Sequence, residues 1–287
     1  MGTVGSGAIT TANDSMLLSD VSGSLRVIGQ EGTSAPGSGF LSGSFNHLVM
    51  TEAGRSVTSE LFKGATTAND YGYLIADDGI SLAILSREAD TLAAGGTFIG
   101  HTGRPAVDDH ERVYFPGALS GVVTTENSGF WYDSAGSLQT FVIEGQDVSA
   151  LTNSPAWLGN VSTTLSAAGS GAAFITALQN NPDNSTQKTA PALNAAIFSG
   201  EPGNLEMVAR KGDVIPAVGK LSTFSAVSRG SGGDHAFISL LSLSTAAPVV
   251  SSSNDQALFA KVAGSLYLVA RENITELAIG IKTLRFG

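Results

Sequence analysis

A segment of the chain recurs five times, and this internal repeat limits the fold more than any other feature of the sequence. Each copy has an apolar run, a glycine-rich turn, and then Ser-Leu or Asn-Leu opening a second apolar run. The leucines that anchor the copies are Leu25, Leu82, Leu138, Leu205 and Leu266. Recurrence at a roughly constant interval is typical of repeat architectures, so we expect five similar structural units.

Further strand-like runs lie between successive copies, for example at 45–50 and 56–62. Each repeat therefore has about four short strands, and helical periodicity is nearly absent. Four strands per unit are typical of propeller blades. Runs such as 266–270 are apolar on both faces, as expected for a sheet covered on both sides. We predict an all-β fold, a β-propeller of five four-stranded blades, with a β-sandwich or another β architecture as the alternative.

The two ends of the chain are expected to complete one blade together. The first copy begins at its third strand, and the last is followed by an apolar run at 277–281. A tail strand paired with the first blade would leave no free sheet edge. If upstream residues have been removed, the blade number is not five. The predicted single domain spans 1–287, with blades at roughly 1–37, 38–95, 96–150, 151–216 and 217–275, and with 276–287 completing the first blade.

The composition excludes several classes of function. A net charge of −10 argues against a nucleic-acid-binding surface. The absence of cysteine excludes disulfides, thiolate metal sites and cysteine catalysis. No apolar run approaches the roughly 20 residues needed to span a bilayer.

The first seven residues lack the cationic and apolar parts of a signal peptide. Either the protein is cytosolic or a leader has been removed. The low lysine content and the abundance of Gly, Ser, Thr and Asn favour an exported bacterial protein, secreted or at the cell surface.

Four segments carry a resemblance to a known family: 67–72, 265–272, 210–213 and 35–37. They resemble a repeat family of uncharacterised exported bacterial proteins, in which an Asn-Asp-Gly strand is followed by a Ser-Leu strand, Arg-Glu-Gly-Asp and Ala-Pro-Gly. The resemblance covers most of the chain and implies a propeller-like repeat and export, but no activity. Individual copies depart from the pattern, since Lys211 stands in place of the acid and Asn273 in place of the glycine.

The polar elements of the repeat should gather on one acidic face, because the Asn-Asp element precedes the third strand and the Glu-Gly element follows the fourth. Asn, Asp and Gly at such positions commonly shape turns, and we favour this structural interpretation. The alternative is a divalent cation such as Ca²⁺, since carboxylate oxygens are hard ligands. Its ligands would be Asp14, Asp70, Asp90 and Asp213. No other cofactor is predicted.

A second group of candidates would surround the central channel. His47 and His101 lie on predicted innermost strands, and two arginines lie on or near its rim, so a metal or an anion could bind there. The predicted ligand-binding residues are His47, His101, Arg104, Arg229, Asp70 and Asp255. The predicted inner strands carry essentially no Asp or Glu, which argues against a pair of catalytic carboxylates.

We therefore predict no catalytic residues and a non-enzymatic binding or scaffold module. Its ligand would be a partner protein or a glycan on the acidic, loop-rich face, from which insertions at 179–191 and 245–254 rise. One alternative is a carbohydrate-active hydrolase with its site at the channel mouth. Another is a surface-structural subunit that self-associates, because the sequence leaves the oligomeric state open.

Overall fold

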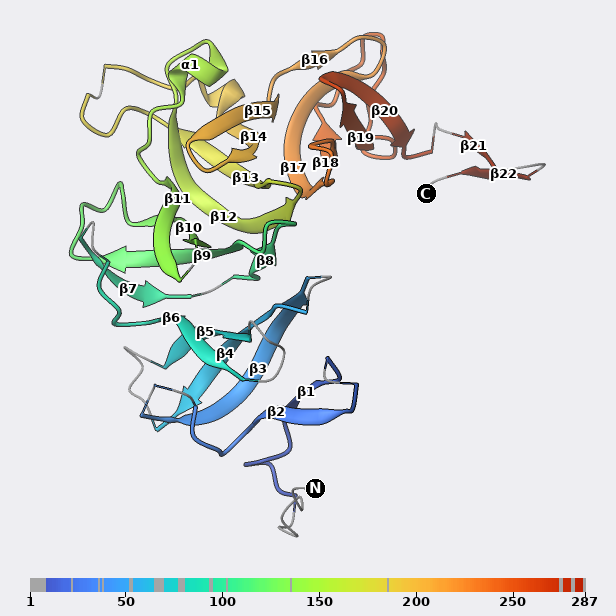
Figure 1. Ribbon diagram of the computed structural model, residues 1–287. Coiled ribbons are helices and arrows are strands. Elements are labelled where there is room, and N and C mark those ends of the chain that lie inside the picture. The colour runs from blue at the N-terminus through green and yellow to red at the C-terminus, as the bar shows by residue number, and fades with distance from the viewer. Residues whose placement is uncertain are drawn as a thin grey trace. The chain divides into compact units, whose positions relative to one another are not determined.

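A computed structural model describes residues 9–285 apart from 22, 36, 38, 52–53, 65–69, 77–80, 93–94, 102, 135, 185, 274–275 and 280–281. The chain forms two compact units, which are described separately. The first comprises Met1–Pro105, Gly117–Val122 and Ala135–Ser137, and the second comprises Ala106–Pro116, Val123–Ser134 and Leu138–Gly287. The described secondary structure is almost entirely β-strand, so the predicted all-β class is confirmed (Figure 1).

The first unit contains a two-stranded pair, β1-β2, and a four-stranded antiparallel sheet in the order β3-β4-β5-β6. Its last strand, β7, pairs with residues 118–120 of β9. The strands are β1 (Met16–Ser19), β2 (Arg26–Gln30), β3 (Leu41–Met50), β4 (Ser56–Lys63), β5 (Tyr71–Ala76), β6 (Ala83–Arg87), β7 (Thr97–Gly100) and β9 (Val113–Ser120).

The second unit contains two further meanders, β12-β13-β14-β15 and β16-β17-β18-β19-β20, together with the strands that neighbour the first half of β9. Its strands are β8 (Ala106–Val107), β10 (Ser128–Ser134), β11 (Ser137–Ile143), β12 (Trp157–Ala168), β13 (Gly171–Gln179), β14 (Ala195–Glu201), β15 (Asn204–Arg210), β16 (Val214–Ile215), β17 (Gly219–Arg229), β18 (His235–Leu241), β19 (Gln256–Val262) and β20 (Ser265–Arg271). The only described helices are short: α1 (Ser149–Thr152) and the 3-10 turn η1 (Pro191–Leu193).

Burial on both faces explains why alternation fades in the central strands. In β13 residues 171–176 are all buried, and in β5 residues 72–76 are all buried. Within the second unit, Phe174 of one sheet packs in a cluster with Phe130 from β10, and Ile175 packs in a cluster with Phe237 of the following meander. Sheets that face one another in this way bury apolar side chains on both sides, as the sequence indicated.

The C-terminal strands differ from the expected arrangement. β21 (Glu276–Ile279) pairs with β22 (Lys282–Arg285), and β1 pairs with β2 in a separate two-stranded sheet. The predicted pairing of the tail with the first repeat is therefore not found among the described strands, because the tail forms a hairpin with itself. None of the helices in the described ranges has the length and apolar character needed to span a membrane.

Candidate functional site

The repeated Glu-Gly and Asn-Asp elements lie together, as predicted, and their contacts shape the turns. The backbone N–H of Glu31 donates to the Ser15 carbonyl, which follows the Asn-Asp element of its own repeat. The backbone N–H groups at Glu88, Glu144, Lys211 and Glu272 make the same bond in their repeats, with distances of 2.8–2.9 Å. The carboxylates add a second link, since Glu31 accepts from the Ser15 amide and Glu88 from the Tyr71 amide.

The residue after each repeated acid explains the glycine at that position. Gly32 and Gly145 have φ values of 81° and 83°, in the left-handed region. A Cβ at either would lie 2.8 Å from a backbone carbonyl oxygen, so a larger residue at these two positions would be crowded as well as strained in conformation. Ala89 and Asn273 occupy the same place with φ values of 70° and 53°.

The predicted metal ligands Asp90 and Asp213 serve these turns instead. The Asp90 carboxylate accepts the backbone N–H of Arg87 at 2.7 Å, and Asp213 accepts that of Arg210 at 2.8 Å. The guanidinium of Arg210 is buried and donates to the carbonyl oxygens of Leu193 and Thr152. The Arg-Glu-Gly-Asp element thus holds neighbouring loops together, which favours its structural interpretation.

The other two predicted metal ligands lie beside repeated glutamates. Asp14 is exposed and contributes a hydrogen bond that lowers the pKa of Glu31. Asp70 is half-buried and faces Glu88, where burial and the nearby Asp70 raise the pKa of Glu88 to about 7. No group of three or more metal-ligating side chains occurs among the described residues, and the cation site stays a prediction.

The two predicted channel histidines have very different surroundings. His47 is exposed and has a φ of 49°. His101 is 1% exposed, packs against Tyr73 and Phe98, and its Nε2 lies 2.7 Å from Ser86 Oγ. Burial lowers the pKa of His101 to about 3, so its ring is neutral. Contact between His101 and a ligand would require this packing to open.

The remaining predicted ligand-binding residues are not brought to one place by any described contact. Arg104 is exposed. Arg229 donates to Ser199 Oγ at 2.6 Å and lies beside the buried His235, whose pKa is lowered to about 4 by burial and by this arginine. Asp255 lies near Arg271 and partly offsets the lowering of the Arg271 pKa by burial. Ligand binding by these residues stays a prediction.

A carboxyl group that the sequence did not indicate lies in the first unit. Glu60, in the middle of β4, has no exposed surface. Its Oε1 accepts the Gly43 amide at 3.2 Å, and its Oε2 is buried with no hydrogen-bond partner. Burial raises the pKa of Glu60 to about 7, and hydrogen bonds from Ser42 and Gly43 oppose this only in part. Glu60 therefore keeps its proton in weakly acidic solution.

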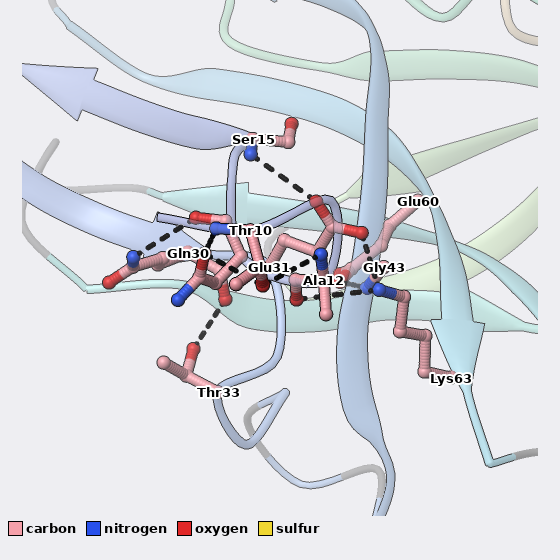
Figure 2. A network of polar contacts seen from close by, with 10 residues as sticks. Thr10, Ala12, Ser15, Gln30, Glu31, Thr33, Gly43, Glu60 and Lys63 are labelled. Atoms are coloured by element: carbon pink, nitrogen blue, oxygen red, sulfur yellow. Dashed lines mark hydrogen bonds and ion pairs between the residues drawn. The ribbon is translucent and has the colours of Figure 1, made fainter. Parts of the chain in front are cut away.

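Glu31 has the opposite electrostatic environment. Its Oε1 forms an ion pair with Lys63 Nζ at 2.5 Å, and this contact lowers the pKa of Glu31. The Lys63 ammonium also donates to the Ala12 carbonyl oxygen (Figure 2). Lys63 ends β4, three residues after Glu60, so one strand supplies both the buried acid and the cation that ionises the second glutamate.

An open hollow of about 430 Å³ lies at this place and is lined by both polar and apolar groups. Its walls include Asn13, Gln30, Glu31, Thr33 and Lys63. The lining loop is joined to the Glu60 environment through Ser42, which exchanges backbone hydrogen bonds with Gly32 and Thr33. Figure 2 shows Glu60 and Gly43 in the same view as this polar network. No local sequence signal marks Glu60, because its burial arises from sheet packing.

The family to which the chain belongs is shown by a match over residues 1–286. The matching model is described as a Family of unknown function (DUF7453). The chain belongs to this family. No curated protein matches the chain in sequence.

Solved structures give remote similarities. The α-L-arabinofuranosidase of Fusarium graminearum and the α-L-arabinanase of Penicillium chrysogenum each give a TM-score of 0.38, with 8% and 9% identity. In both cases 90% of this chain and 71% of the other are covered. An ulvan lyase of polysaccharide lyase family PL25 gives a TM-score of 0.37 at 8% identity, and 78% of this chain then spans 57% of the lyase.

The prediction of a non-enzymatic module, with no enzyme activity, is wrong on these findings. The structures to which the chain is similar are carbohydrate-active enzymes, whereas the prediction had no enzyme activity. The first unit also holds the kind of group that this alternative requires, a buried carboxyl whose pKa is raised to about 7. The predicted inner strands carry essentially no Asp or Glu, whereas Glu60 lies on the second strand of its sheet.

Proposed function

We propose that this protein is an acid–base enzyme that hydrolyses glycosidic bonds in a neutral, hydroxyl-rich substrate. Glu60 would supply the proton and Glu31 the ionised carboxylate, at the hollow lined by Asn13, Gln30 and Lys63. Amide, hydroxyl, ammonium and carboxylate groups suit a ligand that presents many hydroxyl groups, because each can donate or accept a hydrogen bond. The carbohydrates on which the similar enzymes act serve only as a choice of substrates to test.

The observation that carries the proposal is the opposite shift of two glutamate pKa values: Glu31 lines the hollow, and Glu60 is buried on β4, the strand that also supplies Lys63. Burial raises the pKa of Glu60 to about 7, whereas Lys63 lowers that of Glu31. Two carboxyl groups whose environments separate their pKa values in this way can take the roles of acid and base at the same pH.

The proposed reaction is a hydrolysis with one water. Glu60 transfers its proton to the glycosidic oxygen as the bond between the anomeric carbon and that oxygen breaks. Water attacks the anomeric carbon, and Glu31 accepts the proton that this water loses. Since Glu60 is covered by Ser42 and Gly43, we expect this segment of β3 to open when substrate binds.

The test is release of reducing sugar from arabinobiose, arabinan, ulvan and β-1,3-galactan between pH 5 and 9. We expect wild-type protein to act on at least one of them, with activity falling above about pH 7 as Glu60 loses its proton. Glu60→Gln should lower kcat by about 10²–10⁴-fold, because amide nitrogen cannot act as the acid. Glu31→Gln should lower kcat as well, because the amide cannot accept the proton that the attacking water loses.

Glu126→Gln is the matched control. It also replaces a glutamate carboxyl by an amide, but Glu126 is exposed. It should keep the wild-type rate. Thermal unfolding of all variants separates lost chemistry from lost structure. Absence of release from every substrate, or a wild-type rate in folded Glu60→Gln, would contradict the proposal.

We further propose that the five repeats form a closed five-bladed propeller and that the protein acts outside the bacterial cell. The four-stranded meanders and the hydrogen bond that recurs in all five turns support the first part. The composition supports the second part, that the protein acts outside the cell. Deleting residues 276–287 should lower the melting temperature if the tail closes the ring, and fractionation of cells that express the protein tests export.

A further inference from the structure

The fourth repeat differs from the others in both length and charge. Residues 180–194 join the second and third strands of its sheet, β13 and β14, as a long loop that ends in the 3-10 turn η1. Under this loop lies an open hollow of about 470 Å³. Its lining includes Gln179, Asn180, Lys188, Thr189 and Asn194. The insertion therefore creates a second open hollow, in the second unit of the molecule.

The charge of this repeat is reversed at the position of the repeated acid. Where Glu31, Glu88 and Glu144 stand in other repeats, the fourth has Lys211, whose Nζ donates to Asn194 Oδ1 at 2.9 Å. Asn194 lines the hollow. A cation thus replaces an anion beside this hollow, in a chain whose net charge is −10.

Two residues of the lining carry hydrogen-bond donors for which no partner is described. Gln179 Nε2 is buried and makes no hydrogen bond. Within the described part of the chain, Lys188 forms neither an ion pair nor a hydrogen bond, and its side chain is exposed at the lining. By contrast, the loop satisfies its own backbone, since Asn180 Oδ1 accepts the Thr189 amide and Thr189 Oγ1 donates to the Pro155 carbonyl oxygen.

We propose that the hollow under the 180–194 loop binds an oxyanion, a carboxylate or sulfate group carried by a sugar or free in solution. Lys188 supplies the charge, the Gln179 amide donates a hydrogen bond, and Lys211 strengthens the positive potential through its place beside Asn194. Charge-assisted hydrogen bonds from ammonium and amide donors are the contacts that such anions require. The inference is independent of Glu60 and Glu31, which lie in the other unit.

Titration calorimetry with the full chain tests the site, with sodium glucuronate, sodium sulfate and glucose as separate probes. We expect saturable binding of glucuronate, of sulfate or of both, weakened by added salt, and no binding of glucose at this site. Binding of one anion or of both identifies which oxyanion is preferred. Lys188→Gln should weaken binding about tenfold, which corresponds to one charge-assisted contact. Gln179→Leu should weaken it less.

Lys220→Gln is the matched control, since Lys220 is exposed on β17 and does not line the hollow. It should bind as wild type does. Glu60→Gln should also keep anion binding, so that failure of this proposal and failure of the hydrolase proposal can be told apart. Equal affinity for glucose, no binding of either anion, or unchanged affinity in both Lys188→Gln and Gln179→Leu would overturn the inference.

Discussion

Two buried carboxyl groups, one in each unit, have almost no exposed surface but very different partners. Asp108, in the second unit, accepts the backbone N–H groups of His110 and Arg112, the Arg112 Nε at 2.8 Å and the Tyr114 hydroxyl at 3.1 Å. Glu60, in the first unit, accepts the Gly43 amide, and its Oε2 has no hydrogen-bond partner.

The difference shows that the partners of a buried acid decide its role. Asp108 forms an ion pair with Arg112 at 2.7 Å, and the same arginine donates to the Ser170 carbonyl oxygen, so the acid anchors a turn. Glu60 has no cation among its described contacts, and burial raises its pKa to about 7. A fully partnered acid is suited to holding structure, whereas a poorly partnered acid can give up or take a proton near neutral pH.

The largest expected loss of stability follows from substitution of Asp108. Asp108→Ala should lower the free energy of unfolding by about 3–5 kcal/mol, because it leaves the buried side of Arg112 without its counter-charge. Urea denaturation measures this loss. The neighbouring Asp109 is exposed, and Asp109→Ala should change stability by less than about 0.5 kcal/mol. Similar losses in the two variants would show that Asp108 is not the anchor described here.

The next effect concerns Glu60 and depends on pH. The folded-state pKa of about 7 lies above the ordinary value of 4.5, so the unfolded chain loses this proton first. Between about pH 4.5 and 7 the wild-type free energy of unfolding should therefore fall, by about 3 kcal/mol, and then level off. Glu60→Gln should remove the part of this fall that comes from Glu60, so that its stability relative to wild type is greater at pH 8 than at pH 5. Glu88, whose pKa is also raised, contributes equally to the fall in both proteins. Parallel curves for the two proteins would contradict the raised pKa.

A smaller effect is expected at the hydroxyl that supports Asp108. Tyr114→Phe removes one hydrogen bond to a buried carboxylate and should lower the free energy of unfolding by about 1–2 kcal/mol. Tyr132→Phe is a matched control, since its hydroxyl bonds the exposed Gln139 and should matter less. Equal and negligible losses would mean that the tyrosine does not support the anchor.

The smallest expected effect is a shift in the titration of Glu60 when Ser42 is substituted. Its hydroxyl lowers the pKa of Glu60, so Ser42→Ala should move the titration midpoint of Glu60 above about 7, by less than about one pH unit. Carbon-13 NMR of the glutamate carboxyl groups follows this midpoint. Ser44→Ala, at an exposed position of the same strand, should leave it in place. A midpoint that falls in Ser42→Ala would reverse the proposed influence of the hydroxyl.

Local patterns predicted much of the secondary structure and the turns. The recurring apolar runs predicted the four-stranded meanders, and the glycine after each repeated acid predicted a special backbone conformation, observed at Gly32 and Gly145. These features depend on residues close in the sequence, whose spacing fixes strand, turn and left-handed backbone. The predicted pairing of the tail with the first repeat is not found among the described strands, where β21 and β22 pair with each other, and closure of the ring by the tail stays a prediction.

The candidate site could not be predicted in the same way. A glutamate in a strand gives no sign of whether water will reach it, and the environment of Glu60 depends on Ser42 and Gly43 of another strand. The repeat by itself determined the class of fold, the approximate strands and the turn chemistry. The tertiary structure alone decided that Glu60 is shielded from water and that Glu31 pairs with a cation, because pKa values depend on contacts between residues far apart in the chain. It also decided which hydrogen-bond donors line the hollow under the insertion.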